Sequence, residues 1–202
     1  MVRPRSDISE RIRDAACDRF LADGVDGASL RAIAANAKTS IGMVYYYYPS
    51  KDELFFAVVE ATYSKLVADL ALALSPEVNV EERLRRLYER IGALSEAELR
   101  VLRLVVCELL KSTARFERIV QRFQVGHVAL IASTVRDAFA QGTFDRSRHP
   151  LVAMVSMLGL GGIAQIMCRF AADRLPFPGA PAGKELSAEL VDVLLHGVAR
   201  KS

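Results

Sequence analysis

One stretch, residues 29–51 (SLRAIAANAKTSIGMVYYYYPSK), constrains the fold of this chain more than any other. Ser29 is a favourable N-cap residue, and apolar side chains then recur every three to four positions, the pattern of a short helix with one buried face. Thr39 and Ser40 favour turns and caps over helix interiors, so a second helix is expected over residues 41–47. Helices this short are unstable alone in water. The stretch therefore predicts two short helices held by packing across a tight turn.

Four consecutive tyrosines, residues 45–48, fall at the end of this stretch. Successive helical residues point about 100° apart, so the four rings cannot all be buried. Val44 and Tyr48 are the expected inward pair. An exposed phenol can donate to a phosphate, and its ring can pack on a sugar or a thymine methyl group. The run also has high β-propensity, but helical patterns flank it and no second strand is predicted. We therefore expect a helix-turn-helix that reads double-stranded DNA.

Short motifs over residues 24–54 carry a resemblance to a known family. They are Gly24-Val25-Asp26-Gly27-Ala28-Ser29, Ile33-Ala34, Ala37-Lys38-Thr39-Ser40, Val44-Tyr45-Tyr46-Tyr47-Tyr48 and Ser50-Lys51-Asp52-Glu53-Leu54. In this combination they resemble the DNA-binding domain of the TetR-type (tetracycline repressor-like) transcriptional regulators. The resemblance implies an all-α protein. Its N-terminal three-helix, helix-turn-helix DNA-binding domain would occupy residues 1–50, and a C-terminal helical ligand-binding and dimerisation domain would occupy residues 51–202.

The resemblance also implies roles for individual side chains, carried over position by position. Phosphate contacts are expected from Ser29, Tyr45, Tyr47 and Lys51. Base edges are expected to be read by Arg31, Ile41, Gly42, Met43 and Tyr46, and Ser40, at the start of the reading helix, completes the DNA-binding set.

Two residues depart from the family pattern. Lys38 replaces the usual turn glycine, and a lysine held at positive φ costs on the order of 1 kcal/mol relative to glycine. Ile41 replaces a frequent small or basic residue, and with Met43 it makes the expected reading face apolar, which favours thymine methyl groups over guanine. Arg31 could bind guanine through two hydrogen bonds, or it could be a solvated charge on a helix face.

The remainder of the chain also has helical patterns, with no strand pattern and no internal repeat. A first helix is expected from Asp7 to Gly24, behind a terminus whose Arg3 and Arg5 form either a basic arm for a minor groove or a floppy end. A long helix is expected to begin at Lys51 and to link the DNA-contacting end to the rest of the chain as a lever. Further helices are predicted over residues 79–94, 95–110, 116–141 and 186–198, with a loop at 176–183.

The most apolar run of the chain is residues 151–168. Its length raises the alternative of a transmembrane helix. The run contains glycines and a mid-run glutamine, however, and a helix that is apolar all round is otherwise buried between partners. Together with the final amphipathic helix, it exposes more apolar surface than one small domain can cover, which predicts a two-fold helical interface between two copies of the chain. The resemblance implies the same homodimer, built as a four-helix bundle.

Composition narrows the classes of function. The chain is 51% hydrophobic and 25% charged, with a net charge of +3, as in a packed globular protein without a strongly basic surface. Cys17, Cys107 and Cys168 lie far apart, with no histidine at metal-ligand spacing, so they indicate buried thiols in a reducing, cytoplasmic compartment. No signal peptide, nucleophile motif or phosphate loop is recognisable. No enzyme, cofactor or metal site is therefore expected.

These patterns predict a ligand-responsive, homodimeric repressor that binds a roughly palindromic operator and is released by a small hydrophobic or aromatic molecule. Candidate pocket residues, which could equally be plain core, are Leu104, Cys107, Phe116, Phe123, His127, Met154, Met157 and Leu158. The alternatives are a helical small-molecule-binding protein or enzyme without DNA binding, and a membrane-anchored regulator. Activation instead of repression also stays open.

Overall fold

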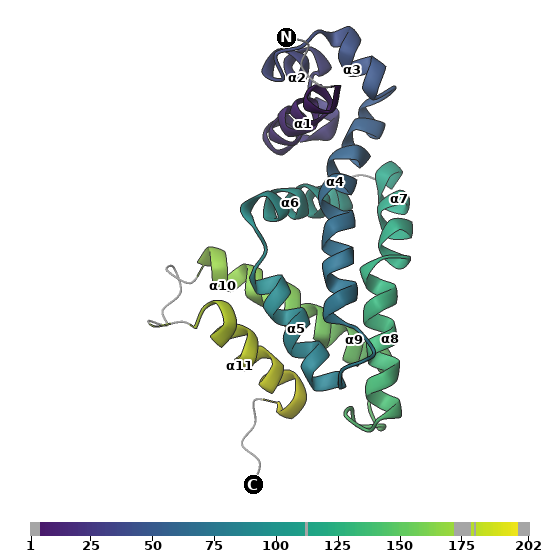
Figure 1. The fold of residues 1–202 in the computed structure, drawn as a ribbon, viewed down its shortest axis with the longest axis vertical. Helices are drawn as coiled ribbons and strands as arrows, with labels where there is room; N and C mark the ends of the chain where they lie inside the picture. The colour runs from purple at the N-terminus through teal and green to yellow at the C-terminus, as the bar shows by residue number, and fades with distance from the viewer. Residues whose placement is uncertain (1–4, 112, 172–178, 180, 198–202) are drawn as a thin grey trace. The chain divides into compact units, whose positions relative to one another are not determined.

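The computed structural model describes residues 5–111, 113–171, 179 and 181–197, and among them it contains helices and no strand (Figure 1). The all-α class predicted from the sequence is confirmed. The elements, in chain order, are α1 (Arg5–Gly27), α2 (Leu30–Asn36), α3 (Ile41–Tyr47), α4 (Lys51–Ala73), α5 (Val80–Gly92), α6 (Glu96–Lys111), α7 (Thr113–Gln124), α8 (His127–Ala140), α9 (Pro150–Leu158), the π-helix η1 (Gly159–Ala164), α10 (Gln165–Ala171) and α11 (Gly183–His196).

The chain divides into two compact units. The first comprises residues 1–66 and 95–122, and the second comprises residues 67–94 and 123–202, so that the divisions fall inside α4 and inside α7. The boundary predicted at residue 50 separates the DNA-binding part from the rest of the chain. The compact units are different, because α6 packs against α1 and therefore belongs to the first unit. The boundary at residue 50 stays a prediction.

The first unit is built on a core shared by α1, α2, α3 and the start of α4. Ile12, Ile33, Val44 and Leu54 have no exposed surface. Each of them lies on the buried face of a different helix, and burial of these faces holds α2 and α3, which have seven residues each and are too short to persist alone. The helical path of α1 breaks at Gly24, whose φ is 75°, where the sequence predicted its end.

The second unit is held by a buried polar group at the centre of α5, η1 and α11. The Tyr88 hydroxyl donates to the Met157 carbonyl oxygen at 3.0 Å, and the Gln165 amide donates to the Tyr88 carbonyl oxygen at 2.8 Å. The Ser187 hydroxyl donates to the same Tyr88 oxygen at 3.2 Å. A Cβ on Gly161 would lie 2.4 Å from the Tyr88 ring, so only glycine lets this ring approach the helix. Burial raises the pKa of Tyr88.

The expectation of one helix over residues 116–141 is wrong, and a second segment departs from regular α-helix. The single helix predicted over residues 116–141 is two helices, because α7 ends at Gln124 and Gly126 is non-helical, with φ of −102° and ψ of −121°. The apolar run 151–168 is helical throughout, but its glycine-rich middle forms the π-helix η1 between α9 and α10. Glycine is a poor helix former and tolerates both departures.

Two further expectations meet the limits of the described residues. Of the predicted N-terminal arm, Arg5 already belongs to α1, and residues 1–4 lie outside the described part of the chain. Most of the loop predicted at residues 176–183 is likewise outside it, and α11 begins earlier than expected, at Gly183.

The helix from Pro150 to Arg169 is long and apolar enough to cross a membrane, with a mean hydropathy of 2.0, and 17% of that window is buried. Its large exposed apolar side chains are Leu151, Val152, Val155, Ile163 and Met167. Exposed apolar side chains gathered in this way are typical of a surface that a partner or a membrane covers.

Candidate nucleic-acid interface

The turn between α2 and α3 keeps a left-handed residue. Lys38 has φ of 51°, and it is the one non-glycine residue at positive φ in the part of the chain that the structure describes. The Lys38 amide donates to the Ala35 carbonyl oxygen at 3.0 Å, and the Thr39 amide donates to that of Ala34 at 3.0 Å. The lysine therefore adopts the conformation of the glycine that it replaces, at a conformational cost on the order of 1 kcal/mol.

α3 is fixed by one cap and two inward side chains. The Ser40 hydroxyl accepts the Met43 amide proton at 3.3 Å, which is the N-cap expected from the sequence. Val44 is fully buried, and Tyr48 is 8% exposed. The Tyr48 hydroxyl lies 2.7 Å from the Ser9 hydroxyl and donates to the Ser9 carbonyl oxygen at 3.2 Å. The predicted inward pair, Val44 and Tyr48, is thus buried, and Tyr48 is hydrogen-bonded to α1.

The opposite face of α3 is exposed and apolar. Tyr45 is 51% exposed, Tyr46 is 65% exposed and Ile41 is 36% exposed, and Gly42 lies open between them. The ring of Tyr46 stands edge-on to that of Tyr47, with 5.2 Å between centroids. α3 carries no charged side chain. Of the other predicted DNA contacts, Ser29, Arg31 and Ser40 are exposed, and Met43, Tyr47 and Lys51 are half-buried.

Lys51 opens α4 with a contact that the sequence did not indicate. Its ammonium donates to the Asp26 carbonyl oxygen at 2.7 Å, which ties the start of α4 to the end of α1. An ammonium has three N–H donors, so this bond leaves capacity for a phosphate. The tether fixes where the lysine head lies.

A buried arginine of α7 joins the elements behind this surface. Arg115 has a side-chain exposure of 6% and donates to Glu108 of α6 at 2.7 Å, to Asp52 of α4 at 2.9 Å, and to both carboxylate oxygens of Asp26 at 2.9 Å. Burial lowers the pKa of the Arg115 guanidinium, but the hydrogen bonds to the three carboxylates outweigh it and raise that pKa. The Arg115 cluster, meaning Arg115 with Glu108, Asp52 and Asp26, locks the first turn of α4 to α1, α6 and α7.

Two more arginines of α7 continue this contact along α4. Arg118 donates to Glu53 at 3.2 Å, and its guanidinium lies 3.8 Å from the centroid of the Phe56 ring. Arg122 binds both carboxylate oxygens of Glu60, at 2.9 and 2.8 Å. The hydrogen bond from Arg122 lowers the pKa of Glu60 and raises that of Arg122. Within the first unit, a row of ion pairs therefore joins α7 to α4.

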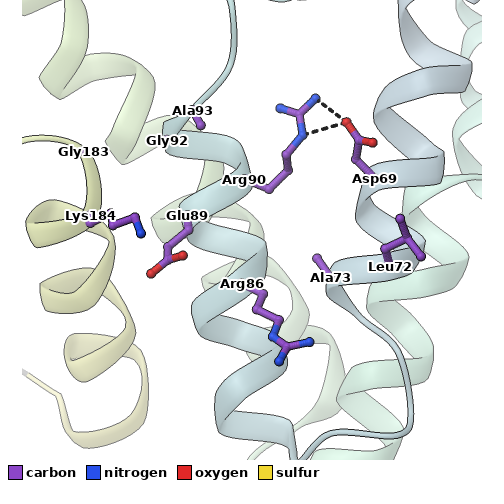
Figure 2. Close-up of a pocket in the computed structure, with 10 residues that line it drawn as sticks. All are labelled: Asp69, Leu72, Ala73, Arg86, Glu89, Arg90, Gly92, Ala93, Gly183 and Lys184. Atoms are coloured by element: carbon purple, nitrogen blue, oxygen red, sulfur yellow. Dashed lines mark hydrogen bonds and ion pairs between the residues drawn. The ribbon is translucent and has the colours of Figure 1, made fainter.

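The second unit contains an open cavity of about 590 Å³. Leu72, Ala73 and Ala93 supply apolar wall from the end of α4 and the end of α5, and Lys184 adds a cation from α11. Figure 2 shows Arg90 and Asp69 pointing toward each other across the gap between α5 and α4, where the guanidinium and the carboxylate are 3.0 Å apart. The remaining lining residues are Arg86, Glu89, Gly92 and Gly183.

None of the eight pocket residues predicted from the sequence lines this cavity. Leu104, Cys107 and Phe116 belong to the first unit, where Leu104 is buried and Phe116 is 47% exposed. The other five belong to the second unit: Phe123, His127, Met154, Met157 and Leu158. Phe123 and His127 stack edge-on with centroids 4.8 Å apart, and burial lowers the pKa of His127. These residues stay predictions as a ligand site.

The Arg115 cluster is the main feature that sequence reasoning missed. Arg115 lies 89 positions from Asp26 and 63 from Asp52, so no local pattern connects them. The available signal was the spacing of Arg115, Arg118 and Arg122, which places three cations on one helix face. From the sequence alone, such a charged face is expected to be exposed to solvent.

Comparisons with known proteins agree with the fold and with the predicted DNA-binding stretch. Residues 12–58 match the family described as "Bacterial regulatory proteins, tetR family". The chain is 32% identical over 111 residues to the HTH-type nicotine-responsive transcriptional repressor HdnoR of Paenarthrobacter nicotinovorans, a match that covers 55% of this chain and 52% of the relative. It is 32% identical over 134 residues to the HTH-type transcriptional repressor SCO4008 of Streptomyces coelicolor, covering 65% of each. These matches span about half to two thirds of the relatives' lengths.

A solved structure extends the likeness to the whole fold. The transcriptional regulator FadR of Bacillus subtilis, in complex with stearoyl-CoA, has a TM-score of 0.75 at 14% identity, over 94% of this chain and 99% of that one. The likeness in fold extends over nearly the full length, and the likeness in sequence lies with helix-turn-helix repressors. Residues 12–58 of this chain therefore match the TetR family of bacterial regulatory proteins, and the chain as a whole is similar to such regulators.

Proposed function

We propose that this protein is a cytoplasmic, homodimeric, sequence-specific DNA-binding repressor that a small hydrophobic or aromatic ligand releases from its operator. The observation that supports this best is α3 itself. Val44 and Tyr48 hold the helix from behind, while Ile41, Tyr45 and Tyr46 stand exposed on the other side. Exposed apolar side chains clustered on one face of a two-turn helix are typical of a surface that another molecule covers.

The expected DNA contacts fall into two groups. Ser29, Tyr45, Tyr47 and Lys51 carry hydroxyl or ammonium donors suited to phosphate oxygens, which position a protein on the duplex. Arg31, Ser40, Ile41, Gly42, Met43 and Tyr46 would lie toward base edges in the major groove, which carry the sequence information. Residues 1–50 would act as the DNA-binding part, and the remainder as the part that dimerises and responds to ligand.

The homodimer would form through the exposed apolar row of α9, η1 and α10, together with α11. Five large apolar side chains between Leu151 and Met167 are exposed in the single chain. Burying them against the same row of a second copy would give an isologous interface. Two reading helices separated by about 34–36 Å would then fit successive major grooves of a roughly palindromic operator.

For the ligand, the cavity beside α4 is a better candidate than the eight residues predicted from the sequence. Its volume of about 590 Å³ lies within the common range for small-molecule sites. The last turn of α4 contributes Leu72 and Ala73 to it, and the first turn of the same helix carries Lys51. A ligand with different affinities for two positions of α4 would shift the balance between operator-bound and released states.

The relatives guide the chemical class of the ligand. One of them is nicotine-responsive, and one similar structure contains stearoyl-CoA. Both molecules combine apolar surface with a polar or charged group, as does the lining of the cavity, where Leu72 and Ala93 lie beside Arg90 and Lys184. Nicotine and stearoyl-CoA are therefore the first probes for a thermal-shift screen, and a ligand that raises Tm should also weaken DNA binding.

Selection of duplexes from a random pool by the purified protein tests the proposal. Enrichment of a motif with two inverted half-sites supports a dimeric DNA reader. Failure to enrich any sequence at about 0.1 M salt, where phosphate contacts are only moderately screened, would contradict it. Recovery of the protein in the soluble fraction without detergent would separately reject the membrane-anchored alternative, which the apolar helix from Pro150 to Arg169 keeps open.

A further inference from the structure

Gly42 has no structural role that the chain itself explains. It lies in α3, is exposed, and its φ is outside the left-handed region that favours glycine. A Cβ at this position would meet only the Ser40 hydroxyl oxygen, at the ordinary contact distance of 3.8 Å. Alanine would therefore fit without strain, and it would also be the better helix former. The protein keeps a destabilising residue where its own packing leaves room for a side chain.

The exposed neighbours of Gly42 form a recess around it. In a helix, residues three and four positions apart share a face, so Gly42 lies on the face of Tyr45 and Tyr46. These are the two most exposed tyrosines of the run. Their positions three and four residues after Gly42 place one on each side of it, one turn further along the helix. Ile41 adds an apolar wall. The result is a bare backbone bordered by apolar side chains and phenol rings.

The chemistry of this recess favours an apolar group over a hydrogen-bonding one. α3 has no charged side chain, and the cations between residues 30 and 47 are Arg31 in α2 and Lys38 in the turn. In the major groove, the apolar group that distinguishes one base pair from the others is the C5-methyl of thymine. We infer that a thymine methyl group packs directly on the backbone of α3 at Gly42, beside Ile41 and Tyr46, and that this contact specifies an A·T pair in each half-site. The inference rests on the proposed function.

The test uses the duplex enriched from a random pool by the wild-type protein. The half-site is expected to contain an A·T pair that is invariant among the selected sequences. Replacing its thymine by deoxyuridine removes only the methyl group, and this should weaken binding about fourfold, the loss expected for one buried methyl. Gly42→Ala should weaken binding to the thymine duplex about tenfold or more, because the new methyl group occupies the recess.

The thermal stability of Gly42→Ala separates this role from a structural one. The variant should melt about 1–4 °C higher than the wild type, since alanine favours the helix. Gly27→Ala is the matched control, because Gly27 is also exposed, is not at positive φ, and its added Cβ would meet only the Asp23 Cβ, again at 3.8 Å. The control should keep wild-type affinity for DNA.

The two substitutions should also be coupled. In the Gly42→Ala protein, exchange of thymine for deoxyuridine should no longer weaken binding, because the alanine side chain already excludes the thymine methyl group from the recess. Wild-type affinity in Gly42→Ala, equal losses from uracil in both proteins, or half-sites specified by guanine would overturn the inference while leaving the DNA-binding function standing. A pool without any enriched duplex would instead reject the proposed function itself.

Discussion

The Arg115 cluster offers a stability prediction whose magnitude follows from burial. Arg115 and Glu108 have side-chain exposures of 6% and 4%, so their ion pair is shielded from water. Arg115→Met keeps the length of the side chain but removes its charge and leaves Glu108 buried opposite an apolar group. Breaking a buried pair from one side costs about 3–5 kcal/mol. Asp26 and Asp52 are 84% and 47% exposed, so their loss adds only about 0–1 kcal/mol each.

Thermal or urea unfolding of the purified variant measures this effect. For a chain of this length, about 1 kcal/mol corresponds to about 2–4 °C, so a total loss of about 3–7 kcal/mol in Arg115→Met should lower Tm by about 6–28 °C. Arg118→Met is the matched control on the same helix. Its ion pair with Glu53 is about half exposed on both sides, and its guanidinium also lies on the Phe56 ring, so the loss of both contacts should cost no more than about 2 kcal/mol.

A double variant separates the charge from the packing. Arg115→Met combined with Glu108→Leu removes both members of the buried pair, and replacing a buried pair by apolar side chains is often neutral. The double variant should therefore regain most of the stability lost in Arg115→Met. A loss below about 1 kcal/mol in the single variant, or no recovery in the double, would refute the view that Glu108 depends on Arg115.

Three further predictions follow from single positions. Lys38→Gly should raise the free energy of unfolding by about 1 kcal/mol, because Lys38 sits at φ of 51°; a lower urea midpoint would be contrary to this. Burial lowers the pKa of His127, so the unfolded chain binds a proton more readily below its ordinary pKa of about 6.5. Stability should thus be complete above this pH and fall as pH drops toward the folded-state pKa, and His127→Gln should flatten the curve measured by urea unfolding. Tyr45→Phe should weaken binding to specific and random duplexes alike, whereas Tyr46→Ala should change sequence preference in a repeated selection; equal losses for both variants on both kinds of DNA would reject the assigned roles.

The helix-turn-helix could be predicted because its signals are local. The cap at Ser40, the apolar spacing of α2 and the inward pair Val44 and Tyr48 all act within a few residues, and the structure shows each of them. The turn at Lys38 kept its geometry although the residue type changed. Packing of the helices on both sides holds the backbone of the turn in this conformation, so a non-glycine residue is tolerated there.

The rest depends on contacts distant in sequence. The Tyr88 ring enters the space that Gly161 leaves open, so the reason for that glycine lies 73 positions away in α5. The π-helix and the helix break at Gly126 could not be predicted either, because the spacing of apolar residues alone does not show where a helix ends. The cavity was missed because methionine and phenylalanine were taken as the signal, whereas charged side chains such as Asp69 and Arg90 line it.

In the proposed function, two copies of this chain read two inverted half-sites through α3. Fluorescence anisotropy with the selected duplex, and with the same duplex carrying one scrambled half-site, tests it most directly at about 0.15 M salt. Two chains should bind per intact duplex, and scrambling one half-site should weaken binding by about a hundredfold or more, because non-specific binding is far weaker than specific binding. Equal affinities for the two duplexes, or one chain per intact duplex, would contradict the account.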